Sequence, residues 1–114
     1  MTMNPATRRV NQRHDVQLPM EVISGDSSRP AVIQNISVGG LYFYCDFPVE
    51  RQQLFTVAFS IPTLEVPIRV ETVVRWTEKI GEATTGVGVQ FLGLKAREVW
   101  AVTKFFTSLS TTNL

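Results

Sequence analysis

The amino-acid sequence predicts a mainly β fold: a small, closed or nearly closed antiparallel barrel of six strands, followed by one C-terminal helix. In six short segments between residues 18 and 92, apolar side chains tend to recur at every second position, as in half-buried strands. From Lys95 onward they recur at spacings of three and four, which is typical of one helix face. The 114 residues, 44% of them hydrophobic, suffice for one domain with a packed core.

The expected elements follow from these two periods. The clearest alternation lies in residues 66–77, where one face holds Val66, Ile68, Val70, Thr72, Val74 and Trp76. In residues 40–46, Tyr42 and Tyr44 point away from the face formed by Leu41, Phe43 and Cys45. We expect strands at residues 18–24, 31–36, 40–46, 54–61, 66–77 and 86–92. The helix, which has only weak capping residues at its start, is expected to bury Val99, Val102, Phe106 and Leu109.

The charge distribution divides the chain into two parts. Residues 1–17 are polar without a sustained period, so we expect a flexible N-terminal arm there, with the barrel and helix in residues 18–114. Residues 1–14 carry three arginines and no acid, whereas the other hundred residues carry eight bases and ten acids. Because the body is mildly acidic, we do not expect binding to long DNA or RNA.

Several classes of protein are disfavoured by what the sequence lacks. With Cys45 as the single cysteine and His14 as the single histidine, neither an intrachain disulfide nor a metal cluster is expected. No segment has the apolar length of a membrane span or the pattern of a signal peptide, so we expect a cytoplasmic protein without membrane insertion. No arrangement of residues indicates acid–base or nucleophilic catalysis, and we expect neither enzymatic activity nor a cofactor.

Two short motifs contain groups suited to an anionic ligand. Arg9 and Arg13 are four residues apart, and their guanidinium groups could hold phosphate or the O6 and N7 acceptors of guanine. Asn35 and Ser37 are two residues apart at the end of an expected strand, with Gly40 close behind. Each motif alone is more typical of a structural feature, the first of a solvated basic tail and the second of a hairpin turn.

Two further positions have ambiguous roles. Trp76 ends the best-patterned strand, where it could belong to the core or lie at the barrel rim and stack on a base. The segment 86–91 contains Gly86 and Gly88 but lacks the spacing of a dinucleotide-binding motif, so Gly88 more often marks a bend or bulge.

In this order and context, the motifs resemble the PilZ family, whose pattern is RxxxR followed by [D/N]xSxxG on a six-stranded barrel with a C-terminal helix. The resemblance covers about residues 8–109. It implies a receptor for the bacterial second messenger cyclic di-GMP, acting through a downstream protein partner in motility, biofilm or exopolysaccharide control. It implies as ligand-binding residues Arg8, Arg9, Arg13, Asn35, Ser37, Gly40 and Trp76. In that family, the glycine at the position of Gly40 keeps the surface clear for the ligand.

Three functions remain open at this stage. The first is the non-catalytic receptor. The second is a ligand-independent adaptor with a PilZ-like fold in type IV pilus or surface-motility machinery, which predicts an exposed apolar patch on the helix around Trp100 and Phe105. The third is a small barrel that binds single-stranded nucleic acid, which the acidic body disfavours. Ligand stoichiometry and oligomeric state do not follow from the residues.

Overall fold

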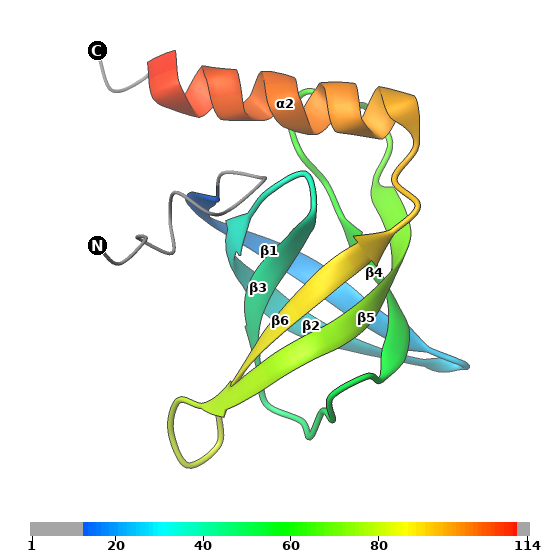
Figure 1. Ribbon diagram of the computed structural model, residues 1–114, viewed down its shortest axis with the longest axis vertical. Coiled ribbons are helices and arrows are strands. Elements are labelled where there is room, and N and C mark those ends of the chain that lie inside the picture. The colour runs from blue at the N-terminus through cyan, green and yellow to red at the C-terminus, as the bar shows by residue number, and fades with distance from the viewer. Residues whose placement is uncertain (1–12, 112–114) are drawn as a thin grey trace, which may run out of the picture.

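A computed structural model describes residues 13–111, and it contains a closed six-stranded antiparallel barrel with a C-terminal helix (Figure 1). The order of strands around the barrel is β1-β2-β3-β6-β5-β4, and every neighbouring pair is antiparallel. This confirms the predicted fold class. The elements are β1 (His14–Ser24), β2 (Ser27–Ile36), β3 (Gly40–Cys45), β4 (Leu54–Phe59), β5 (Ile68–Lys79), β6 (Thr85–Leu92) and α2 (Ala96–Thr111). The expected arm falls mostly on residues 1–12, outside the described residues.

The barrel interior is filled by the alternating apolar residues of the strands. The side chains of Phe43, Ile33 and Ile68 are fully buried, and the predicted inward faces of β3, β4 and β6 are buried throughout. Thr72 is the fully buried polar residue among them, and its hydroxyl donates to the carbonyl oxygen of Phe55 at 3.0 Å. Because that hydroxyl has a partner, its burial avoids the cost of an unsatisfied polar group.

The strands differ from the predicted bounds by up to four residues. β2 begins at Ser27 rather than at residue 31, and β4 ends at Phe59 rather than at residue 61. β1 begins at His14, four residues earlier than expected, because its first residues pair with the end of β2, as in the pair Asp15↔Asn35. Residues 14–17 therefore belong to the barrel. β5 begins at Ile68 rather than at Val66, whose side chain is 49% exposed. β5 also ends at Lys79 rather than at Thr77, so the strand is shifted by two residues relative to the prediction.

The helix α2 lies across one end of the barrel, opposite the loop between β5 and β6 (Figure 1). Its buried face contains Ala101, Val102 and Phe105, whereas Val99 is 37% exposed, and Phe106 and Leu109 are only partly buried. The buried face is therefore rotated by about one residue relative to the predicted face. The sequence pattern misled because the first turn buries a charged residue, Glu98, instead of an apolar one.

Glu98 explains how this helix starts without a capping side chain at Lys95. Its carboxylate oxygen Oε1 accepts a hydrogen bond of 2.9 Å from the backbone N–H of Lys95, which is half of a capping box, and an acidic group in the first turn also favours the helix dipole. We expect Glu98→Ala to lower the free energy of unfolding by about 1 kcal/mol. Urea denaturation measures this loss, and Glu82→Ala, at an exposed position outside the regular elements, is the control. Equal losses in both variants would contradict the capping role.

Candidate ligand-binding site

The two sequence motifs meet where β1 begins and β2 ends. Arg13 directly precedes β1, and Asn35 lies on β2 opposite Asp15. Arg13 Nη1 donates a hydrogen bond of 3.0 Å to Asn35 Oδ1. The antiparallel pairing of β1 with β2 therefore joins two residues that are 22 positions apart in the sequence. Arg8 and Arg9 lie outside the described residues.

Ser37 forms the turn between β2 and β3. It is 4% exposed, and its hydroxyl oxygen accepts a hydrogen bond of 3.1 Å from the backbone N–H of Gly39. The same hydroxyl lies 3.4 Å from the carbonyl oxygen of Gly40, which also accepts the Ser37 backbone N–H at 2.8 Å. These bonds fix the shape of the turn. The structure thus gives Ser37 the hairpin role.

Gly40 is required by the packing of two strands. A Cβ atom at Gly40 would overlap the carbonyl oxygen of Val89 on β6 and would lie 3.1 Å from the carbonyl carbon of the same residue. Gly40 is buried and pairs with Gln90, and its φ is not positive. The glycine therefore permits the close approach of β3 to β6. This packing requirement is independent of the role that the family resemblance implies for Gly40, which is to keep the surface clear for a ligand.

Trp76 lies on the outside of the barrel. An extra residue on β5, Arg75, interrupts the ladder between the pairs Val74↔Val89 and Trp76↔Gly88. Such a bulge reverses the alternation of the residues that follow. Val74 is therefore fully buried, whereas Trp76 is 40% exposed. Of the two positions considered for Trp76, the core is excluded.

Strand register places the polar and aromatic groups in one row on the outer surface. Asn35 pairs with Tyr42, Tyr42 pairs with Gly88, and Gly88 pairs with Trp76. The rings of Tyr42 and Trp76 stack with centroids 5.0 Å apart and an interplanar angle of 18°. A Cβ atom at Gly88 would overlap Trp76 Nε1 and Cε2, so the missing side chain makes room for the indole. The bulge expected at Gly88 lies across from it instead, at Arg75.

Tyr42 is held by Glu78 at the edge of this row. The Tyr42 hydroxyl donates to Glu78 Oε2, and the two residues are brought together by Gly86, over which the tyrosine hydroxyl lies. Burial, reinforced by the adjacent Glu78 carboxylate, raises the pKa of Tyr42 far above its usual value. The phenol therefore keeps its proton at neutral pH and acts as a donor.

The site thus has a cationic end and an aromatic end. The guanidinium of Arg13, oriented by Asn35, can bind phosphate or a purine edge, and the exposed indole of Trp76 offers a stacking surface. The sequence analysis missed Tyr42 and Glu78 as members of the site. The outward phase of Tyr42 was predicted, but the proximity of Glu78 depends on the bulge in β5.

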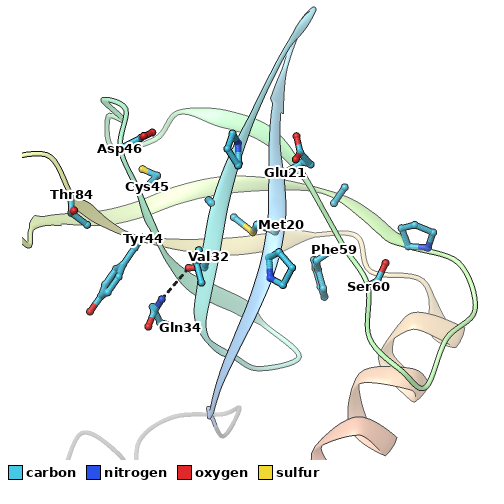
Figure 2. Close-up of a pocket in the computed structure, with 15 residues that line it drawn as sticks. Met20, Glu21, Val32, Gln34, Tyr44, Cys45, Asp46, Phe59, Ser60 and Thr84 are labelled. Carbon is cyan, nitrogen blue, oxygen red and sulfur yellow. Dashed lines mark hydrogen bonds between the residues drawn. The ribbon is translucent and has the colours of Figure 1, made fainter.

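A separate groove of about 820 Å³ lies on the outer surface of β1, β2, β3 and β4 (Figure 2). It is lined mainly by apolar groups such as Pro19, Pro30 and Val32, and Gln34 and Tyr44 lie at its edge near the row described above. Among the predicted site residues that the structure describes, none lines the groove. It also lacks a basic side chain in its lining, so it does not suit an anionic ligand.

The family model of the PilZ domain matches residues 7–105 of the chain. The chain belongs to the PilZ domain family. This confirms the resemblance inferred from the two motifs. Within residues 13–111, PilZ membership accounts for the barrel, for the order of its strands and for the terminal helix. No helix in that range is long and apolar enough to cross a membrane, and no group of three or more His, Cys, Asp or Glu residues there could hold a metal ion.

Solved PilZ structures share this fold at low sequence identity. The Bacillus subtilis inhibitor of motility MotI superposes with a TM-score of 0.80 at 17% identity, covering 94% of this chain and 53% of MotI. The PilZ domain of YcgR from Escherichia coli, solved with c-di-GMP, gives a TM-score of 0.71 at 12% identity, covering 93% of this chain and 97% of that domain. The chain therefore spans about half the length of MotI. No curated protein sequence matches it at a significant level.

Proposed function

We propose that this PilZ domain is a non-catalytic receptor for cyclic di-GMP. The observation that carries the proposal is the hydrogen bond between Arg13 and Asn35, which unites the two family motifs on the row that ends at Trp76. The YcgR PilZ domain of the same fold was solved with this nucleotide. A ligand with two phosphates and two guanines needs what this surface offers, namely arginine donors, an amide and an aromatic face.

Each residue has a defined role in this proposal. Arg9 and Arg13 hold phosphate oxygens and the O6 and N7 acceptors of guanine, and Arg8 adds positive charge directly before them. Asn35 orients Arg13 and hydrogen-bonds a guanine. Ser37 and Gly40 maintain the turn and the strand contact beneath the ligand, and Trp76 stacks on a base.

Signal relay would begin where the arginine segment meets the helix. His14, the residue after Arg13, stacks on Phe106 of α2 with ring centroids 4.0 Å apart and an interplanar angle of 21°. A ligand that draws Arg13 toward itself therefore acts on a residue whose neighbour contacts the helix. We propose that this change of the arm and helix surface is recognised by a downstream protein partner in motility, biofilm or exopolysaccharide control.

A calorimetric titration of cyclic di-GMP into the wild type and Arg13→Ala tests the receptor function. We expect saturable binding to the wild type and a loss in the variant of about 13- to 160-fold, because a hydrogen bond from a charged donor contributes about 1.5–3 kcal/mol. Arg69→Ala removes the same charge from an exposed position on β5, opposite Ala58 of β4, and is expected to bind normally. Absence of saturable binding to the wild type would contradict the proposal.

One observation favours the adaptor as a second candidate. Trp100 is 59% exposed on α2 beside Val99, and Lys104 Nζ lies 5.8 Å from the centre of its ring. Phe105, which the sequence placed in the same patch, is instead buried against the barrel. If the chain acts without the nucleotide, a double variant Arg9→Ala/Arg13→Ala keeps its protein partner and Trp100→Ala loses it. The opposite result in a co-purification assay would exclude the adaptor.

A further inference from the structure

We propose that Glu78, held in place by Tyr42, is a specificity-determining residue that reads the Watson–Crick edge of a guanine at this site. The inference rests on the proposed function and extends the site beyond its two family motifs. Glu78 would be the ligand-contacting group, and Tyr42 would be its positioning residue. The consequence is selectivity for guanine over adenine in ligands of equal charge.

The placement of Glu78 beside Trp76 comes from the strand geometry. The two residues are two positions apart on β5, after the bulge, and their partners on β6 are Gly86 and Gly88. Residues at this spacing point to the same face and are separated by roughly 7 Å along the strand. Because both partners are glycines, no β6 side chain separates the carboxylate from the indole. The Tyr42 ring covers one face of the indole, so the base of our proposal stacks on the opposite face and extends its edge past the indole toward the exposed carboxylate.

The second step concerns the orientation of that carboxylate. Glu78 Oε2 accepts the Tyr42 O–H, and the tyrosine ring is itself fixed by stacking on Trp76. Tyr42 is 9% exposed, so its position is determined by packing rather than by solvent. Among the described residues, no lysine or arginine forms a hydrogen bond with Glu78. The tyrosine thus aims the carboxylate without neutralising it, as a second group orients a ligand-binding one.

The chemistry of the base edge selects guanine. Guanine presents two donors side by side on its Watson–Crick edge, N1–H and the exocyclic amine, and a carboxylate accepts from both. Adenine presents an acceptor at N1, which faces a carboxylate unfavourably. A negative charge beside an anionic dinucleotide also costs electrostatic energy, and that cost is the same for both bases. The ratio of the affinities for the guanine and adenine dinucleotides therefore distinguishes recognition of the base from electrostatic repulsion of the phosphates, whereas one affinity alone does not.

The test measures binding of cyclic di-GMP and cyclic di-AMP to the full chain and to three variants. Glu78→Gln keeps the size of the side chain and the acceptor for Tyr42, but it replaces one carboxylate oxygen with a donor. We expect it to weaken cyclic di-GMP binding roughly 10- to 100-fold, the range of one bidentate base contact, without weakening cyclic di-AMP. Tyr42→Phe is expected to reduce the selectivity in the same direction by a smaller factor. Glu71→Gln makes the same charge change at an exposed position farther along β5, opposite Leu92, and is expected to retain the wild-type selectivity.

The outcomes separate the inference from the function on which it rests. If the wild type binds cyclic di-GMP and Glu78→Gln leaves the ratio of the two affinities unchanged, the inference is overturned and the receptor function stands. If Glu78→Gln binds both ligands more tightly by the same factor, the carboxylate only repels phosphate, and the inference is again overturned. If the wild type binds neither nucleotide, both proposals fall. Thermal unfolding of each variant checks that Tyr42→Phe and Glu78→Gln remain folded.

Discussion

Replacing Gly40 with alanine is expected to lower the free energy of unfolding by roughly 3 kcal/mol, at the upper end for overpacking. The added Cβ would overlap the carbonyl oxygen of Val89 and lie 3.2 Å from Gln90 Cα, and both are backbone atoms. A flexible side chain could rotate away, but a paired strand can relieve this overlap only by separating β3 from β6. Since Phe43 and Val87 pair across the same two strands in the core, that separation would also loosen the barrel interior.

Gly81→Ala is the matched control for Gly40→Ala. Its Cβ would have no atom within 4 Å, and its φ is not positive, so the change is expected to alter stability by less than about 0.5 kcal/mol. Urea denaturation of both variants gives the comparison. If Gly40→Ala proves as stable as Gly81→Ala and yet fails to bind cyclic di-GMP, the glycine serves the ligand and the packing explanation is wrong. If Gly40→Ala is destabilised but its folded fraction binds cyclic di-GMP normally, the role of Gly40 is to allow β3 and β6 to pack together.

The barrel could be predicted because its interior is encoded by local alternation. In β3, β4 and β6, each inward residue is apolar and no bulge interrupts the period, so the core faces followed directly from the sequence. β5 shows where this reasoning ends. The loop before β4 forms two backbone hydrogen bonds with β5, next to the bulge at Arg75. The Gln52 N–H donates to the Val74 carbonyl, and the Val74 N–H donates to the Gln53 carbonyl. A contact between segments this far apart leaves no periodic signal in either one.

The sequence motifs name part of the candidate site, but they predict neither its geometry nor the presence of Tyr42 and Glu78 in it. The motifs named Arg13 and Asn35, whereas their hydrogen bond depends on β1 starting at His14, where the apolar alternation is weak. The sequence indicates a turn or a ligand clearing at Gly40 and a bend or bulge at Gly88, because it does not reveal which atoms approach a glycine. At Gly88 the neighbour is the indole of Trp76, which the bulge turns outward. Three-dimensional neighbours, rather than local propensities, thus define the aromatic end of the site.

Removing the indole at that end gives the second large expected effect. We expect Trp76→Ala to weaken cyclic di-GMP binding roughly 5- to 150-fold, the equivalent of about 1–3 kcal/mol for one stacked base. Since Trp76 is 40% exposed but also stacks on Tyr42, thermal unfolding of the variant checks that the lost affinity does not come from a loss of folded protein. The chain has two tryptophans, so Trp100→Phe leaves Trp76 as the only indole and serves as the control for binding. In that background, cyclic di-GMP is expected to quench the fluorescence in a saturable manner.

A variant that keeps the indole but displaces it tests base stacking without removing any side-chain surface from the site. Gly88→Ala would place a Cβ against Trp76 Nε1 and Cε2, so the ring must move away from its stacked position on Tyr42. If the base stacks on the indole where the structure places it, this single methyl group weakens binding although no contacting residue is deleted. Unchanged affinity in Gly88→Ala, together with a loss in Trp76→Ala, would mean that the ligand meets the indole in another orientation. Unchanged affinity in both variants would remove Trp76 from the site and leave the arginine end to hold the nucleotide alone.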